Sequence, residues 1–275
     1  MEKMFFRDRF KDKVIIITGG SKGIGKATSL RAAKEGAHVV IVSRNKRYGE
    51  ETLSEIINDG GSAIYLSLDL SLEDSCKRMV DETIKSFGRL DIAINNAGVL
   101  GKSCPVHQLT KEDMDYTMKN NFYSVYFSCK YELNEFIKQN NGGVIVNVAS
   151  VAGLVGVPGN PAYCASKHAV NGLTKNLALD YARYGIRINS VNPAGTDTPM
   201  TQQAYAEVME KIADAKAKGL DLSKLSTMAG QKRKAIIERQ ATPDEQAASI
   251  LYLASDDATH MTGAAVQTDG GWTAF

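Results

Sequence analysis

Short runs of β-branched and other apolar residues recur along the 275-residue chain and alternate with stretches of helical character. Apolar strands that alternate with helices are typical of a parallel sheet covered by helices on both faces. The chain is therefore predicted to form one α/β domain over residues 1–275, with a doubly wound, seven-stranded parallel sheet. The expected strands are Val14–Thr18, Val39–Val42, Ile64–Leu68, Ile92–Asn95, Val144–Val148, Ile186–Val191 and Ala264–Thr268.

The charge balance argues against a nucleic-acid partner. Lys and Arg number 33 against 31 Asp and Glu, and no basic run is present to follow a phosphate backbone. Residues 1–10 mix charges with three Phe and lack the apolar core of a signal peptide. No apolar run approaches the roughly 20 residues that span a bilayer, so we expect a cytoplasmic protein without a membrane segment. The four Cys residues lie far apart without metal-ligand spacing, and no metal site is expected.

One segment, from about residue 198 to 242, departs from the alternation of strands and helices. It is rich in Lys and Ala and lacks strand character. Tyr205, Val208, Met209 and Ile212 repeat at the spacing of one helix face, which fits either core packing or a cover over a binding site. Because the segment is long, we interpret it as a helical lid inserted above the sheet.

The first expected strand ends in a glycine-rich loop, TGGSKGIG at residues 18–25, which runs into a helical stretch. Glycines allow a tight turn and let a pyrophosphate approach the N–H groups at a helix N-terminus. The dipole of the helix favours negative charge at that end. The loop therefore predicts a dinucleotide site.

Two other motifs match this loop by letter, and a purely structural glycine turn is a third alternative. Residues 19–23 satisfy G-x-S-x-G, the nucleophile elbow of α/β-hydrolases. Only about 20 residues precede Ser21, too few for the strands and oxyanion loop of such an enzyme. Residues 20–26 resemble a P-loop, but Ala27 stands where Mg²⁺ coordination requires Ser or Thr.

The position about 20 residues beyond the glycines indicates which dinucleotide is preferred, since an acid there holds the 2′-hydroxyl of NAD(H) and a cation meets the 2′-phosphate of NADP(H). Ser43 and Arg44 occupy that place, and Lys22 adds a second positive charge. Ser43 would hydrogen-bond the phosphate and Arg44 would clamp it. The sequence favours NADP(H), with NAD(H) as the alternative if Lys22 and Arg44 are ordinary surface cations.

Tyr163 and Lys167 are four residues apart on a helical stretch that is expected to continue to Tyr184. This spacing places both on one helix face. A phenol with a pKa near 10 is a poor catalyst at neutral pH, but an adjacent ammonium lowers that pKa toward the working range. The pair is therefore a candidate general acid and base, although this spacing also arises by chance in many helices.

Two more polar residues extend this constellation. Ser150 follows the strand expected at residues 144–148, and open α/β sheets bind ligands at the carboxyl ends of their strands. Its hydroxyl would hydrogen-bond a substrate oxygen beside Tyr163. Asn121 is a polar residue in an expected helix, where it serves either packing or catalysis.

Five motifs stand in register over nearly the whole chain: the glycine loop, N-N-A-G at residues 95–98, Ser150, Tyr163 with Lys167, and D-G-G-W at residues 269–272. In this order and spacing the chain resembles the short-chain dehydrogenase/reductase family, and its ends resemble 3-oxoacyl-carrier-protein reductases. The resemblance implies a Rossmann domain in which Tyr163 transfers the proton. It also implies that Lys167 holds the nicotinamide ribose and lowers the pKa of Tyr163.

By the same resemblance, Ser150 polarises the substrate carbonyl and Asn121 anchors a water that relays protons to Lys167. Asp69 would meet the adenine, residues 95–98 would form the cofactor floor, and Thr18 would tie neighbouring turns together. The residues expected at the cofactor site are Thr18, Gly19, Ser21, Lys22, Gly23, Ile24, Gly25, Ser43, Arg44, Asn45, Asp69, Leu70, Asn96, Ala97, Gly98, Tyr163, Lys167, Pro193, Gly195, Thr196 and Thr198.

One departure from the family pattern follows the sixth strand. Ala194 stands where the family usually has Gly, which leaves the local backbone path open. Pro193 and Thr198 remain in place. The carboxamide of the nicotinamide is therefore still expected to be held by the Thr196 backbone and the Thr198 side chain.

The sequence as a whole predicts an oxidoreductase that moves a hydride between NADP(H) and a carbonyl or secondary alcohol, with Tyr163 as general acid and base. A cofactor-binding sensor without turnover is the alternative from another class, but it would not need the acid–base pair. The resemblance also implies a homotetramer. The substrate is expected to have an apolar body, because the expected pocket walls are Val151, Leu154, Val155, Val157, Met200, Tyr205 and Met209.

Overall fold

The computed structural model describes residues 6, 8–219 and 235–274. Within these residues, seven parallel strands form one sheet in the order β3-β2-β1-β4-β5-β6-β7. The direction of strand addition reverses between β1 and β4, which makes the sheet doubly wound, as predicted. The strands are β1 (Val14–Thr18), β2 (His38–Ser43), β3 (Ser62–Ser67), β4 (Ile92–Asn95), β5 (Gly143–Val148), β6 (Ile186–Pro193) and β7 (Ala265–Thr268).

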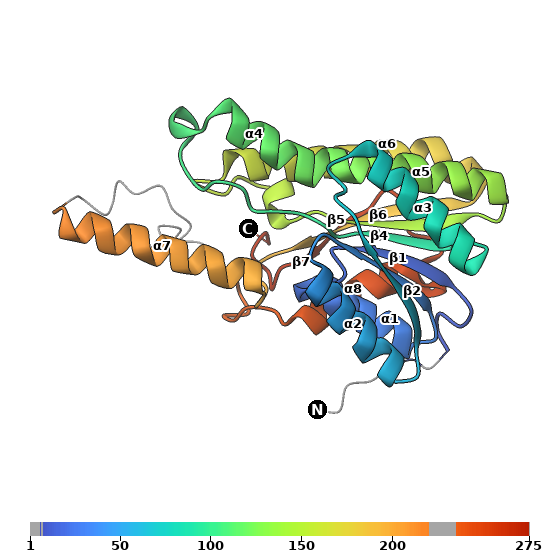
Figure 1. Ribbon diagram of the computed structural model, residues 1–275. Helices are drawn as coiled ribbons and strands as arrows, with labels where there is room; N and C mark the ends of the chain where they lie inside the picture. The colour runs from blue at the N-terminus through green and yellow to red at the C-terminus, as the bar shows by residue number, and fades with distance from the viewer. Residues whose placement is uncertain (1–5, 7, 220–234, 275) are drawn as a thin grey trace.

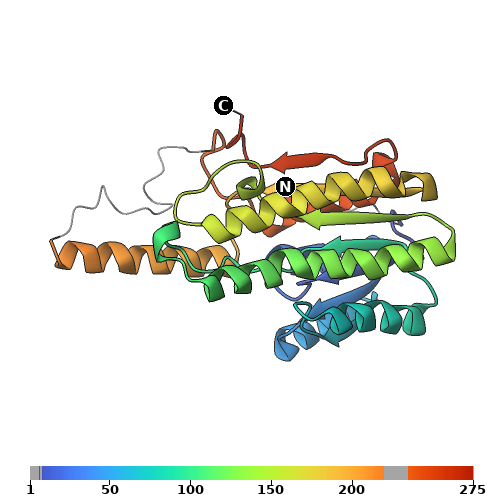
Figure 2. The ribbon, with the colours of Figure 1, turned by 90° about the horizontal axis from the view of Figure 1, so that it is seen from above.

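Helices cover both faces of this sheet (Figure 1). α3, α4, α5 and α6 lie on one face, and α1, α2 and α8 lie on the other. Figure 2 shows α5 and α6 running side by side along the sheet. The helices are α1 (Gly23–Lys34), α2 (Lys46–Asn58), α3 (Glu73–Phe87), α4 (Lys111–Met118), α5 (Ser124–Gln139), α6 (Pro161–Tyr181), α7 (Pro199–Ala217) and α8 (Pro243–Ala254).

The core consists of two apolar layers, because alternate residues of each strand point to opposite faces. Ile16 packs in the layer that contains Met79 of α3 and Phe136 of α5. Its neighbours Ile15 and Ile17 pack in the layer beneath α1 and α8. Burial of each such side chain stabilises the fold by roughly 1.5–3 kcal/mol. The strands are therefore held rigidly from both sides, and their carboxyl ends are fixed in space.

α7 differs from the other helices, because it projects away from the sheet beyond the carboxyl ends of the strands (Figures 1 and 2). Only Val208 and Ala215 of this helix are buried. α7 forms the first part of the predicted lid, whereas residues 220–234 of that segment lie outside the described residues. None of the helices in the described part of the chain combines the length and apolar character needed to cross a membrane.

Candidate active site

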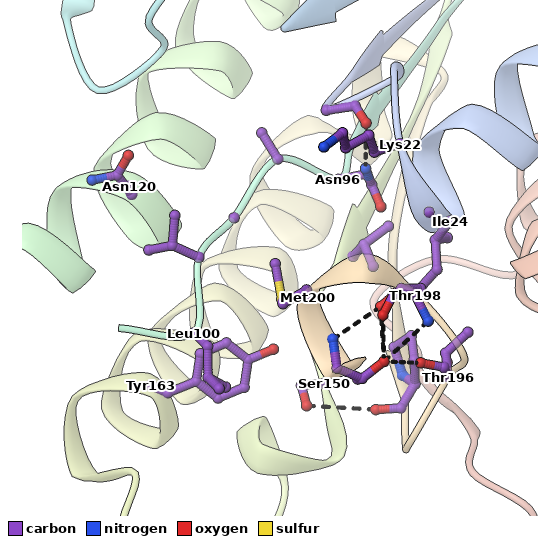
Figure 3. A pocket seen from close by; sticks show the side chains of 18 of the residues that line it. Lys22, Ile24, Asn96, Leu100, Asn120, Ser150, Tyr163, Thr196, Thr198 and Met200 are labelled. Carbon is purple, nitrogen blue, oxygen red and sulfur yellow. Dashed lines mark hydrogen bonds between the residues drawn. The ribbon is translucent and has the colours of Figure 1, made fainter. Parts of the chain in front are cut away.

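A pocket of about 500 Å³ opens at the carboxyl ends of the strands, between the glycine loop and the start of α7 (Figure 3). It brings together, from distant parts of the chain, most of the residues that the sequence predicted for the cofactor site and for catalysis. These are Gly19, Ser21, Lys22, Gly23, Ile24, Ser43, Arg44, Asn45, Asp69, Leu70, Asn96, Ala97, Gly98, Ser150, Tyr163, Lys167, Pro193, Gly195, Thr196 and Thr198.

Two residues expected at the cofactor site lie behind the pocket wall instead. Thr18 Oγ1 accepts hydrogen bonds from the backbone N–H groups of Asn96 and Ala97, at 2.9 and 3.0 Å. It therefore ties the first and fourth strand ends together, as the family resemblance implied. A Cβ on Gly25 would stand 2.2 Å from the carbonyl oxygen of Gly19, so this glycine lets α1 pack against the loop.

The glycine loop fits the phosphates of a dinucleotide. α1 begins at Gly23 without a side-chain cap and without an acid in its first turn. Its first N–H groups are therefore free of side-chain acceptors, and the helix end favours an anion. Gly19 has a φ of +65°, which L side chains rarely adopt.

The end of the pocket opposite the candidate catalytic residues carries two cations. Lys22 and Arg44 both line it, and neither forms an ion pair with a carboxylate anywhere in the described residues. Lys26, one turn into α1, is by contrast paired with Glu55. The Arg44 guanidinium donates instead to the neutral Oδ1 of Asn120, at 3.3 Å. Within the part of the chain that the structure describes, no carboxylate pairs with either cation, so this end of the pocket offers positive charge to an anion.

Ser43 differs from its expected role as a phosphate ligand. Its hydroxyl is buried and has no hydrogen-bond partner among the described residues. The side chain of Tyr65 donates to the Ser43 carbonyl oxygen at 2.9 Å, which fixes the backbone there. In this rotamer the Ser43 hydroxyl is not exposed to the pocket, so a contact with a phosphate requires it to turn.

The candidate catalytic pair, Tyr163 and Lys167, lies in the first turns of α6, which begins at Pro161. Tyr163 lines the pocket, as predicted, and the Nζ of Lys167 lies 5.7 Å from the centre of its ring. Lys167 is only 4% exposed and donates a hydrogen bond of 2.9 Å to the carbonyl oxygen of Val148, at the end of β5. The ammonium is therefore held between the sheet and the phenol.

Burial changes the pKa of both groups. It lowers the pKa of Lys167 from 10.5 to about 8, because the charged form loses its hydration. Burial also raises the pKa of Tyr163, and the hydrogen bond with Ser150 lowers it by less. The expected lowering of the Tyr163 pKa by Lys167 is therefore not found in this structure, where loss of hydration outweighs the other influences.

Ser150 lies where β5 gives way to a short 3₁₀ helix, η3 (Val151–Gly153). Its hydroxyl accepts a hydrogen bond of 3.1 Å from the N–H of Ala152 and lies 3.5 Å from the carbonyl oxygen of Pro193. Figure 3 shows Ser150 and Tyr163 on the wall of the same pocket. Two hydroxyl groups can therefore reach one substrate oxygen.

Asn121 belongs to a π-helix, η2 (Lys119–Tyr123), and not to the regular helix that the sequence predicted. The side chain is fully buried and does not line the pocket. Its Oδ1 accepts from the N–H of Val99 at 2.7 Å, and its Nδ2 donates to the Val99 carbonyl and to Ser166 Oγ at 2.8 and 3.1 Å. Asn121 therefore fixes the loop that follows β4.

Gly98 separates this amide from the catalytic lysine. A Cβ on Gly98 would lie 3.2 Å from Asn121 Oδ1 and 3.6 Å from Lys167 Nζ. Single-turn π-helices occur frequently at functional sites. The water relay from Asn121 to Lys167 stays a prediction.

The cofactor floor is shorter than expected, because Asn95 points to the other side. Asn95 is 1% exposed, and its Nδ2 donates to Glu132 Oε2 and Asn147 Oδ1 at 3.0 and 3.1 Å. Burial raises the pKa of Glu132 to about 8. Only residues 96–98 of the N-N-A-G motif line the pocket.

Comparison with known proteins fits this geometry. The sequence profile of the short chain dehydrogenase family matches residues 13–209. The chain belongs to the short-chain dehydrogenase family. It is 43% identical to a 3beta-hydroxysteroid dehydrogenase of Mediterraneibacter gnavus over 98% of both chains. It is 35% identical to a cyclohexanol dehydrogenase of an Acinetobacter species over 99% of both. The crystal structure of levodione reductase superposes with a TM-score of 0.86 at 32% identity, covering 96% of this chain and 99% of that one.

The loop after β6 in this short-chain dehydrogenase tolerates Ala194, because that residue does not have a positive φ. Thr201 donates to the Thr196 carbonyl, and Thr198 caps α7 by accepting from the N–H of Thr201 at 3.3 Å. Thr196 and Thr198 both line the pocket. The loop is therefore tied to the first turn of the helix that covers the site.

The face of α7 that lines the pocket differs from the apolar face that the sequence predicted. Val208 is 8% exposed and lines the pocket together with Met200 and Ala204. Tyr205 lines its rim at 53% exposure, whereas Met209 is 63% exposed and does not line it. Of the other expected walls, Val151 and Val157 are present, and Leu154 and Val155 are absent.

Several pocket residues had not been selected from the sequence. Ala204 was missed because small side chains carry little weight in an apolar pattern, although the spacing Met200, Ala204, Val208 is helical. Leu100 and Asn160 also line the site from irregular segments. Leu100 closely follows the motif at residues 95–98 and Asn160 closely precedes Tyr163. This proximity is the only sequence signal that could have indicated them.

Proposed function

We propose that this dehydrogenase transfers a hydride between NADP(H) and a secondary alcohol or ketone on an apolar ring, with Tyr163 as general acid and base. One observation carries the proposal. A single pocket joins Tyr163 and Ser150 at one end to the cations Lys22 and Arg44 at the other.

The nicotinamide, when bound, supplies or accepts the hydride. In ketone reduction the Tyr163 hydroxyl gives its proton to the carbonyl oxygen, and in alcohol oxidation the phenolate removes the proton of the alcohol. The Ser150 hydroxyl, which lines the same pocket, orients the same substrate oxygen. A positioned donor of this kind stabilises the charge that develops on the oxygen.

Lys167 acts on the phenol from the sheet side. With a pKa of about 8, its amine is mostly protonated at neutral pH. A nearby positive charge favours the phenolate and so opposes the raising of the Tyr163 pKa by burial. Its remaining N–H groups would hold hydroxyls of the nicotinamide ribose. Asn121 positions the adjoining loop through its two bonds to Val99.

NADP(H) is proposed as the cofactor because Lys22 and Arg44 line the pocket and have no carboxylate partner among the described residues. A phosphate dianion would supply the negative charge that pairs with these cations. NAD(H) is the alternative, in which both cations would only face solvent.

The proposed substrate class follows from the pocket wall and from the relatives. Val99, Leu100, Val151, Met200 and Val208 give the wall near Tyr163 an apolar character. Two relatives are named for the oxidation of a hydroxyl on a steroid or a cyclohexane ring. A 3β-hydroxysteroid or a smaller cyclic alcohol is therefore the proposed substrate.

The test is consumption of NADPH with a panel of cyclohexanone, a 3-oxosteroid and an open-chain methyl ketone. We expect the cyclic ketones to be reduced at least tenfold faster, and the corresponding alcohols to be oxidised with NADP⁺. The Tyr163→Phe variant is the control for non-enzymatic consumption. If the fluorescence of NADPH changes on binding but no ketone leads to its consumption, the protein binds the cofactor without turnover.

A further inference from the structure

The side chain of Lys22 lies against an aromatic ring. Its Nζ is 3.4 Å from the centre of the Tyr48 ring. The face of such a ring is electron-rich and attracts an ammonium. Lys22 is the N-cap residue of α1 and Tyr48 lies in the first turn of α2, so the contact joins the glycine loop to a separate helix.

The fold places Tyr48 there through two further contacts of α2. The helix starts at a defined residue, because Asn45 Oδ1 accepts from the N–H of Tyr48 at 3.2 Å. One turn later, Thr52 is buried with its hydroxyl 3.5 Å from the carbonyl oxygen of Ser21. Tyr48 and Thr52 share a helix face. That face packs on the glycine loop, with Thr52 on the Ser21 backbone and Tyr48 on the Lys22 side chain.

The choice of an aromatic partner has a consequence for charge. A free lysine side chain samples many rotamers, and ordering it costs up to about 2 kcal/mol. A carboxylate would order Lys22 but would also neutralise it, as Glu55 does for Lys26. An aromatic ring orders the ammonium and leaves its positive charge available to an anion.

We propose that Tyr48 is a positioning residue that holds Lys22 ready for the 2′-phosphate, and so contributes to the preference for NADP(H) over NAD(H). This inference rests on the proposed use of NADP(H). The Arg47 guanidinium also lies 5.6 Å from the centre of the Tyr48 ring, but it is paired with Glu51 and does not line the pocket. Lys22 and Arg44 make the contacts with the phosphate, and Tyr48 acts through Lys22. Its effect should therefore be confined to ligands that carry a 2′-phosphate.

The test compares the dissociation constants of 2′,5′-ADP and 5′-AMP, measured by calorimetry. The variants are Tyr48→Leu, Tyr48→Phe, Lys22→Met and the double variant of Tyr48→Leu with Lys22→Met. A cation–ring contact at an exposed site predicts a roughly two- to fivefold loss of 2′,5′-ADP affinity in Tyr48→Leu. Affinity for 5′-AMP stays unchanged, Tyr48→Phe keeps the wild-type affinity for both, and Tyr48→Leu has no further effect beside Lys22→Met.

Other outcomes overturn the inference in distinguishable ways. An equal loss of affinity for both nucleotides in Tyr48→Leu would assign Tyr48 a merely structural role. If Lys22→Met weakens 2′,5′-ADP binding and Tyr48→Leu does not, the Tyr48 inference fails and the NADP(H) proposal stands. If the wild type binds both nucleotides equally and Lys22→Met changes nothing, the NADP(H) proposal itself fails.

Discussion

The two ends of the pocket each carry a lysine, but in opposite surroundings. Lys167 is 4% exposed, bonded to a backbone carbonyl, and its pKa is lowered to about 8. Lys22 is exposed and rests on an aromatic ring. Burial makes the first ammonium sensitive to pH, because deprotonation relieves its lost hydration. Exposure leaves the second charged but open to screening by salt.

The elements that carry the two lysines differ in the same way. Lys167 belongs to α6, which packs on β6 and is hydrogen-bonded to β5, whereas Lys22 belongs to a loop. Proton transfer needs fixed geometry, while attraction of a phosphate acts over a longer range. The comparison therefore predicts that changes at the catalytic end affect rate, and that changes at the other end affect cofactor choice.

The largest expected effect is that of Tyr163→Phe. Loss of proton transfer should reduce the rate of ketone reduction by 10² to 10⁴-fold or more. The dissociation constant of NADPH, measured by fluorescence, should stay within about twofold because the phenol hydroxyl contributes little to binding. A variant with near-normal turnover would remove Tyr163 from its proposed role.

Lys167→Met should change how stability depends on pH. The folded pKa of Lys167 is about 8 and its ordinary value is 10.5, so the unfolded chain binds more protons between these values. Wild-type stability should therefore rise with pH in this window relative to the variant, by up to about 3 kcal/mol. Below pH 8 the difference in the free energy of unfolding between the two proteins should be constant. The variant is most stable relative to the wild type in this range. Urea unfolding of both proteins from pH 7 to 10 measures this, and parallel curves would contradict the burial of a charged amine.

Arg44→Asp should invert the cofactor preference without loss of the acid–base chemistry. A hydrogen bond to a charged group contributes about 1.5–3 kcal/mol, so the ratio of NADPH to NADH affinity should fall by roughly 10- to 100-fold. Lys46→Asp is the matched control, since Lys46 lies two residues away, is paired with Glu50 and does not line the pocket. Equal effects of the two variants would show only a general charge effect.

The smallest expected effect is that of salt. Raising KCl from 50 to 200 mM should weaken NADPH binding by roughly two- to threefold, because Lys22 and Arg44 are exposed to screening ions. NADH binding should change less. Titrations of both cofactors at the two salt concentrations make the comparison. An identical salt dependence would show that Lys22 and Arg44 do not bind the 2′-phosphate.

The sheet was predictable because its strands are continuous β-branched runs, and β1 and β4 have the predicted bounds. The position of Ser150 at a strand end and the spacing of Tyr163 and Lys167 were likewise enough to predict that these residues line one pocket. These features depend on local sequence and on the general geometry of parallel sheets.

Other features depend on tertiary packing and could not be read from the sequence. The π-helix around Asn121 inserts one wider turn that no residue type specifies. The inward turn of Asn95 is set by its hydrogen bonds to Glu132 and Asn147, and the backbone at Ser43 is fixed by Tyr65. The Lys22 contact with Tyr48 joins segments whose approach only the fold determines.

A crystal structure with NADP⁺ bound tests most directly whether one dinucleotide links the two ends of the pocket. We expect the 2′-phosphate in contact with Arg44 and Lys22, and the nicotinamide ribose beside Lys167 with the Tyr163 hydroxyl facing it. A 2′-phosphate that points into solvent, away from both cations, or a nicotinamide remote from Tyr163 would contradict it.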